Sequence, residues 1–84
     1  MSYSLFIQRR AQKQLEDVPV EIYEQLCKEI RDLAHNPRPY GCKKLVARPG
    51  WRIAVRKFRV IYEIDDRQKK VTVLDVDHRK DIYR

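Results

Sequence analysis

The sequence changes its periodicity abruptly at Asn36-Pro37-Arg38-Pro39, and this change limits the chain to one class of fold. Before this point, apolar residues recur every three or four positions, as in an amphipathic helix. After it, apolar and polar residues alternate, as in a half-buried strand. The two prolines stop any helix at the boundary. Helices followed by consecutive strands predict an α+β protein of two layers.

Two helices are expected before the boundary. The first covers residues 8–18 and the second residues 19–34, with Pro19 at the joint between them. Because this joint is short, the two helices should form a hairpin. Apolar residues spaced three or four apart give each helix one face for the core. They are Ala11, Leu15 and Val18 in the first helix, and Ile22, Leu26, Ile30 and Leu33 in the second.

Strand-like segments lie on both sides of the helical hairpin. One covers residues 3–7, and the others cover residues 41–46, 51–55, 58–64 and 71–76. A polar loop at residues 65–70 and a two-residue turn at Arg56-Lys57 should connect the last three, although such a turn prefers Gly or Asn. We therefore expect an N-terminal strand and a helical hairpin packed on a mostly antiparallel sheet of about four strands. Residues 1–84 should form a single domain.

The positive charge of the chain is concentrated in its second half. Residues 1–40 carry six Lys/Arg and six Asp/Glu, whereas residues 41–84 carry thirteen and six and so hold the whole net charge of +7. No acidic residue occurs between Asp32 and Glu63. Such a one-sided field attracts nucleic acid, an acidic protein segment or an anionic membrane surface, unless it is only a solvated face.

Other classes of protein do not fit the sequence. Its two cysteines, Cys27 and Cys42, are too few for a disulfide scaffold and lack the spacing of a zinc site, so we expect reduced thiols. Asp/Glu/His clusters for metal-assisted phosphodiester cleavage are absent, and we expect neither a metal nor a cofactor. The sequence shows neither a signal peptide nor an apolar run near the roughly 18 residues of a membrane span. We expect a cytoplasmic protein without a membrane partner.

The residues best suited to chemistry lie on the strands and at the C-terminal end. Strand alternation puts Arg52 and Arg59 on the same open face of the sheet if the opposite face packs on the helices. An RNA 2′-hydroxyl can attack the adjacent phosphorus without a metal, given a base, an acid and cations for the extra phosphoryl charge. His78 and Tyr83 are the proton-transfer candidates, and Arg52, Arg59 and Arg79 are the phosphate clamps.

These residues also have structural interpretations. Arg59 could pair with Glu63 or Asp75 across the sheet. Tyr83 could anchor the C-terminus on the core. His78 could be a surface residue at the end of a strand.

Three segments resemble the RelE toxins of the RelE/ParE toxin–antitoxin superfamily. They are WRIAV at residues 51–55, FRVIYEI at residues 58–64 and VDHRKDIYR at residues 76–84. The start of the chain is similar as well, with a strand followed by Arg-Arg-Ala-x-Lys-x-Leu. The resemblance therefore covers essentially the full chain.

This resemblance implies a fold, an activity and partners. The family fold is a helical hairpin on a mostly antiparallel sheet, in agreement with the periodicity. Its activity is that of a ribosome-dependent endoribonuclease, which cuts mRNA in the ribosomal A site and inhibits translation. A RelB-like antitoxin would wrap the toxin, and the two together would bind operator DNA. The net charge of +7 favours an antitoxin with acidic and apolar, partly disordered segments.

The resemblance also implies roles for single residues. Arg59 matches the strand arginine that binds the scissile phosphate. Arg79 matches the arginine after the last strand, which assists the leaving group or stabilises charge. Tyr83 matches the C-terminal tyrosine that stacks on or orients the attacked nucleotide, and Arg52 occupies a position that is basic in active members.

The chain departs from the family pattern in two places. Ala54 stands where many active members have a second basic residue, and His78 could compensate for it. The turn Arg56-Lys57 replaces the common Gly-Asp and adds positive charge for ribosomal RNA. Further RNA contacts are expected from the basic residues Lys43, Lys44, Arg48, Arg56, Lys57 and Lys80.

Two other functions remain open. A ParE-like toxin acts on DNA gyrase without nuclease activity, but such relatives generally lack the set of Arg59, Arg79 and Tyr83. A relative made inactive by Ala54 would bind nucleic acid without cutting it.

Overall fold

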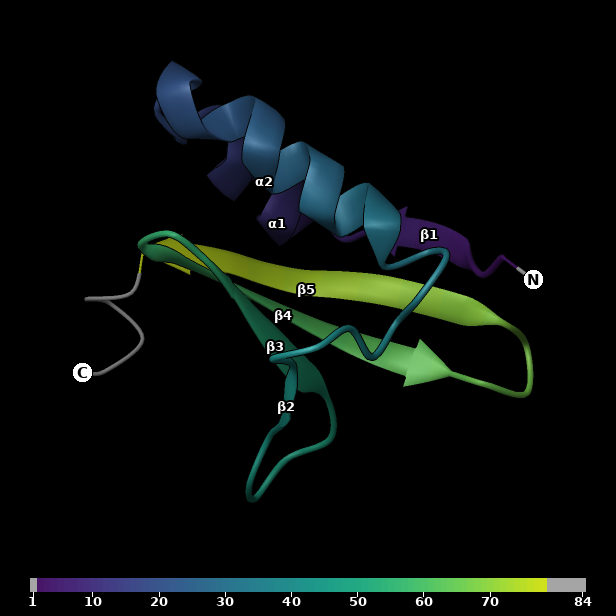
Figure 1. Ribbon diagram of the computed structural model, residues 1–84. Helices are drawn as coiled ribbons and strands as arrows, with labels where there is room; N and C mark the ends of the chain where they lie inside the picture. Colours follow the sequence, from purple (N-terminus) through teal and green to yellow (C-terminus); the bar gives the residue numbers. More distant parts are fainter. Residues whose placement is uncertain (1, 79–84) are drawn as a thin grey trace.

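The computed structural model describes residues 2–78 and shows one sheet with two helices on one of its faces (Figure 1). The predicted α+β class and the two layers are confirmed, but the sheet has five strands rather than about four. Their order in the sheet is β1-β5-β4-β3-β2. The elements in chain order are β1 (Ser4–Ile7), α1 (Arg9–Glu16), α2 (Val20–Asp32), β2 (Lys43–Lys44), β3 (Trp51–Val55), β4 (Phe58–Asp65) and β5 (Lys70–His78).

The fifth strand is β1, which pairs in parallel with β5, from Ser4 opposite Lys70 to Ile7 opposite Val73. The other strand pairs are antiparallel. Periodicity indicates that residues 3–7 form a strand, but it does not indicate which strand pairs with them.

The core lies between the helices and the sheet. Every apolar position predicted for the first helix is buried, as are Leu26, Ile30 and Leu33 of the second, while Ile22 is half-buried. The strands contribute Ile53, Val55, Phe58, Val60, Tyr62, Val71, Val73 and Val76. Tyr62 is fully buried and its hydroxyl donates a hydrogen bond of 2.7 Å to the carbonyl oxygen of Pro37, and burial raises its pKa. This bond fixes the segment that follows α2 against the middle of the sheet.

Arg56 and Gly50 are among the residues with positive φ, a conformation that side chains disfavour. The turn between β3 and β4 lies at Arg56-Lys57 as predicted, and Arg56 adopts it with φ of 56° although it is not glycine. Gly50 has φ of 122°, and a Cβ atom there would lie 3.1 Å from the carbonyl oxygen of Tyr62. Position 50 therefore requires glycine both for its conformation and for its close approach to β4.

Helix α1 holds the end of β5 that β1 does not reach. Pairing of β1 with β5 stops at Val73, whereas β5 continues to His78, two residues beyond the predicted end. Beyond that point the Oε1 atom of Gln14 accepts a hydrogen bond of 2.7 Å from the backbone N–H of Val76. Its Nε2 atom donates to Oδ1 of Asp77 at 2.6 Å. The amide of Gln14 thus replaces a neighbouring strand at this edge.

Candidate phosphate-binding face

The face of the sheet away from the helices carries the two arginines that the alternation predicted there. Arg52 lies opposite Ile61 and Arg59 opposite Ala54 in the β3–β4 ladder, so the two guanidinium-bearing residues share this face. Arg59 is the only charged residue among the buried ones of the described chain, with 8% of its surface exposed. Arg52 is half-buried. We call this surface the open face.

Two carboxylates lie next to Arg59 on the same face. Asp77 of β5 is its direct strand partner, and Asp75 lies opposite Ile61. Both contact α1: Oδ1 of Asp75 lies 2.6 Å from Nε of Arg10, and Asp77 accepts from Gln14. The salt bridge of Asp75 with Arg10 keeps that carboxylate engaged with the helix. A carboxylate on the neighbouring strand lowers the free-energy cost of burying the positive charge of the arginine.

The small side chain of Ala54 removes a possible phosphate contact beside Arg59. Ala54 lies directly opposite Arg59, and it is exposed. A basic side chain at this position would stand about 5 Å from Arg59 across the ladder, close enough to bind the same phosphate. This chain therefore has the two cations Arg59 and Arg52 on the open face, and it lacks the third cation that a basic residue at position 54 would add.

His78 lies on the opposite face from Arg59. It pairs with Phe58, a core residue, and the two rings meet edge to face with their centroids 5.4 Å apart. The imidazole lines a hollow of about 560 Å³ beside the joint between the two helices, together with Asp17, Ile22 and others. The structure thus brings Arg52 and Arg59 together but directs His78 toward the helices.

Three of the predicted site residues, Arg79, Lys80 and Tyr83, lie outside the described residues 2–78. They follow directly after His78, the last residue of β5.

The other predicted RNA-binding residues form two exposed groups. Lys43 and Lys44 form β2, and Arg48 lies in the loop that joins it to β3. Lys43 is the strand partner of Arg52, so Lys43 continues the basic surface of the open face, whereas Lys44 pairs with Trp51, which packs against the core. Arg56 and Lys57 form the turn at the far end of β3, where Nε of Arg56 donates to Oε1 of Gln25 at 3.2 Å.

A polar cluster, which the periodicity did not reveal, lies at the end of the sheet formed by the β4–β5 turn. Asp66, in the β4–β5 turn, accepts hydrogen bonds from the hydroxyl of Tyr3 at 2.6 Å and from Nη2 of Arg38 at 2.8 Å. The hydrogen bonds from Arg38 and Tyr3 lower the pKa of Asp66 to about 2. Arg38 also lies 5.0 Å from the centre of the Trp51 ring. The cluster joins segments far apart in the chain, which is why sequence spacing does not show it.

Metal ligands and membrane helices are not found in the described part of the chain. Residues 2–78 contain no group of three or more His, Cys, Asp or Glu side chains that could hold a metal ion. None of the helices in that range is long and apolar enough to cross a membrane. Cys27 and Cys42 are free thiols.

Comparisons with known proteins agree on one family. The family model described as the ParE toxin of the type II toxin–antitoxin system parDE matches residues 5–83. Toxin RelG of Mycobacterium tuberculosis is 32% identical over 87 residues, which cover 100% of this chain and 99% of the relative.

Solved structures show the same relationship. The toxin–antitoxin complex RelBE2 from M. tuberculosis contains a chain with a TM-score of 0.82 and 26% identity, covering 94% of this chain and 100% of that one. The intact E. coli RelBE toxin–antitoxin complex gives a TM-score of 0.79 and 28% identity, covering 92% and 96%. The chain therefore belongs to the RelE/ParE superfamily and is a toxin of a type II toxin–antitoxin system.

Proposed function

We propose that this toxin is a ribosome-dependent endoribonuclease that cuts mRNA in the A site and so inhibits translation. The observation that carries the proposal is that a buried Arg59 and the half-buried Arg52 lie on the same open face, next to the basic strand β2. RelE structures with 26–28% identity support it.

The chemistry needs little more than charge and position. A base takes the proton of the 2′-hydroxyl, whose oxygen forms a bond to the adjacent phosphorus. The bond from phosphorus to the 5′-oxygen breaks and an acid protonates that oxygen, leaving a 2′,3′-cyclic phosphate and a 5′-hydroxyl. Extra negative charge develops on the non-bridging oxygens. A guanidinium held in place by burial stabilises that charge without reorganisation, and this is the role we assign to Arg59, assisted by Arg52.

Proton transfer is assigned to the C-terminal end. Arginine stays protonated, so Arg79 stabilises charge at the leaving group, whereas the Tyr83 phenol orients the nucleotide and exchanges the proton. An imidazole suits proton transfer near neutral pH, but His78 contacts Phe58 on the face opposite to Arg59. We therefore expect His78→Ala to slow cleavage far less than Tyr83→Phe.

The partners of the toxin follow from the same proposal. A RelB-like antitoxin with acidic and apolar segments would bind the basic toxin, and the complex would bind operator DNA. The protein would act in the cytoplasm, on ribosomes carrying mRNA. Complexes of RelE with RelB in solved structures support the antitoxin.

The test is cleavage of a defined mRNA by purified toxin on translating ribosomes, followed by mapping of the cut ends. Arg59→Ala should slow cleavage by about 100-fold or more, the typical loss when a charge-stabilising group is removed. Arg67→Ala is a matched control because Arg67 is an exposed arginine in the β4–β5 turn, away from Arg59. Circular dichroism of each variant separates loss of activity from loss of fold. If wild-type toxin leaves the mRNA intact on translating ribosomes, the proposal is refuted.

A second function is favoured by one observation, the match to the ParE family model. A ParE-like toxin would act on DNA gyrase and would not need the open-face arginines. Gyrase-dependent DNA breaks on expression, unchanged in Arg59→Ala, would support this function and contradict ribosomal cleavage. A third outcome, RNA binding with no cleavage by any variant, would indicate a relative inactivated by Ala54.

A further inference from the structure

The cations next to Arg59 on the open face lie toward β3 and β2. Arg52 of β3 is two residues from Ala54, the strand partner of Arg59, which puts the two arginines at diagonal positions about 7 Å apart. Lys43 of β2 is the direct strand partner of Arg52, at about 5 Å. No acidic residue occurs in residues 33–62, which supply all three cations. The three form a row that crosses the sheet from β4 to β2.

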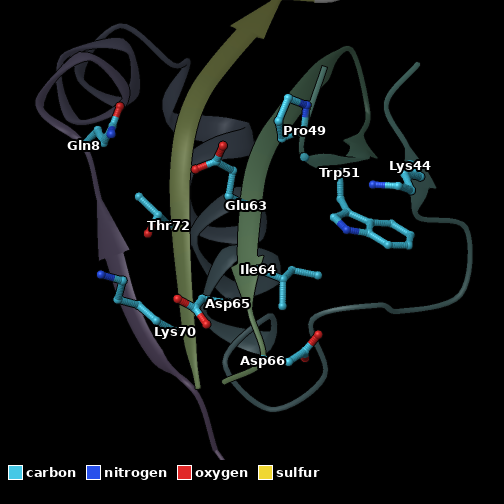
Figure 2. Close-up of a pocket in the computed structure, with 11 residues that line it drawn as sticks. Gln8, Lys44, Pro49, Trp51, Glu63, Ile64, Asp65, Asp66, Lys70 and Thr72 are labelled. Carbon is cyan, nitrogen blue, oxygen red and sulfur yellow. The ribbon is translucent and has the colours of Figure 1, made fainter. Parts of the chain in front are cut away.

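Along β4 the open face becomes acidic. Alternation puts residues 59, 61, 63 and 65 on this face, so Glu63 and Asp65 follow Arg59 (Figure 2). They line a hollow of about 690 Å³ at the far end of the strand. Glu63 is exposed and lies about 13 Å along β4 from Arg59. Its neighbours on the adjoining strands are Thr72 and Gly50, which carry no charge.

Two lysines line the same hollow, but neither neutralises Glu63. Nζ of Lys70 lies 5.4 Å from the centre of the Phe6 ring, on β1 and away from β4. Nζ of Lys44 lies 5.5 Å from the centre of the Trp51 ring, which packs against the core on the helix side of the sheet. The ion pairs formed within residues 2–78 do not include Glu63. A phosphate that followed β4 would therefore meet an uncompensated carboxylate.

The remaining directions from Arg59 also differ in charge. Toward β5 the open face is acidic, because Asp77 is the strand partner of Arg59 and Asp75 lies two residues before it. At the near end of β4, the turn Arg56-Lys57 is basic and exposed. Among the described residues, a strand of RNA thus has two basic directions by which to reach and leave Arg59, which are the turn and the row on β3 and β2.

We propose that single-stranded RNA leaves Arg59 across β3 and β2, with its next phosphate on the pair of Arg52 and Lys43. Glu63 closes the other route, along β4, because its charge repels phosphates. The proposal rests on the proposed function, since it places the next phosphate of the same strand that Arg59 binds. Lys43 then contacts one defined phosphate, and Glu63 determines the direction of the strand.

Two lysines at opposite ends of the open face test the route. The experiment measures binding of a fluorescently labelled 2′-O-methyl RNA hexamer, which cannot be cleaved, to purified toxin without ribosomes over a series of salt concentrations. Lys43→Ala should bind about fivefold more weakly at low salt, the loss expected for one cation about 4 Å from a phosphate in water. It should also lower the slope of log affinity against log salt by about 0.7. Lys70→Ala removes the same charge beyond Glu63 and should bind like wild type.

A second pair of variants tests the role of Glu63. Glu63→Lys and Glu24→Lys have the same net charge, but Glu24 is exposed on α2, in the helical layer on the other face of the sheet. Glu63→Lys should bind the hexamer about 3- to 7-fold more tightly than Glu24→Lys, as expected for two units of charge about 7 Å from a phosphate. Circular dichroism confirms that each variant is folded.

Several results would overturn this route. They are no measurable binding of the hexamer by wild type at low salt, a folded Lys43→Ala that binds like wild type, equal losses in Lys43→Ala and Lys70→Ala, and equal affinities of Glu63→Lys and Glu24→Lys. None of them bears on cleavage, because the assay contains no ribosome. Conversely, the expected hexamer binding together with an uncut message on ribosomes would refute the nuclease and leave a single-strand RNA-binding face.

Discussion

Replacing Gln14 with leucine tests whether a single side chain holds the last part of β5. Leucine has a similar size and an equally good helix propensity, so α1 itself should be unaffected. The substitution removes the acceptor of the Val76 N–H and the donor to Asp77, which Gln14 contacts at 2.7 and 2.6 Å. Because β1 ends opposite Val73, no strand within residues 2–78 pairs with this edge of β5 at Val76 and could replace these bonds.

The expected loss can be built from the two contacts. Val76 is buried, with 2% of its surface exposed, so its N–H is left without an acceptor in an apolar environment at a cost of about 1–3 kcal/mol. Asp77 is half-buried, and water can replace most of the second bond, so its loss adds less than about 1 kcal/mol. Burial of the leucine methyl groups offsets part of this. We expect a net destabilisation of about 2 kcal/mol, which lowers the midpoint of thermal unfolding by roughly 10 °C.

The assay is urea unfolding followed by circular dichroism, with the slope compared between variants to check that unfolding stays two-state. Gln12→Leu is the matched control, since Gln12 lies on the same helix and makes one exposed hydrogen bond of 2.7 Å to the carbonyl oxygen of Ile7. It should cost less than about 0.5 kcal/mol. Equal effects of the two substitutions, or a Gln14→Leu protein as stable as wild type, would show that β5 does not depend on this amide.

Three further substitutions test other parts of the fold. Because Arg38 and other neighbours lower the pKa of Asp66 from 3.8 to about 2, its contribution to stability is present above about pH 4 and is lost as the pH falls toward 2. The stability difference between wild type and Asp66→Asn in urea unfolding should therefore shrink over that range, and a difference independent of pH would contradict the assignment. Gly50→Ala should destabilise by roughly 1–3 kcal/mol in the same assay, because of the positive φ and the contact with the Tyr62 carbonyl. Arg56→Gly should stabilise the turn by up to about 1 kcal/mol through relief of its positive φ, and a less stable variant would indicate that the bond to Gln25 matters more.

Periodicity predicts the helices and strands because each element must turn its apolar residues toward the core. The stripe of Leu26, Ile30 and Leu33 had to face inward for the helix to bury apolar area, and all three are buried. Alternation likewise determined that Arg52 and Arg59 share a face. These predictions depend on neighbours within one element, which sequence spacing describes well.

The features that were not predicted depend on contacts between distant segments. One is the parallel pairing of β1 with β5, and another is the support of β5 by Gln14. A third is the hydrogen bond from Tyr3 to Asp66, which brings the N-terminal segment to the β4–β5 turn. Each of these contacts joins residues more than 60 positions apart. The position of His78 was missed for a related reason. The β4–β5 ladder contains a register shift at Ile61/Tyr62, and alternation counted along β5 alone does not reveal on which face its last residue lies.

The arrangement around Arg59 connects the scaffold to the proposed chemistry. A guanidinium with 8% exposure keeps one position only if its surroundings are fixed, and the carboxylate of Asp77 is its strand partner. Asp77 is in turn held by Gln14, and Asp75 by Arg10, so α1 determines where negative charge lies beside the arginine. If a substrate phosphate must compete with Asp77 for Arg59, a toxin with Asp77→Asn should bind RNA more tightly at low salt. If the carboxylate only positions the arginine, the same variant should bind RNA no better and cleave more slowly, and the two measurements together distinguish these roles.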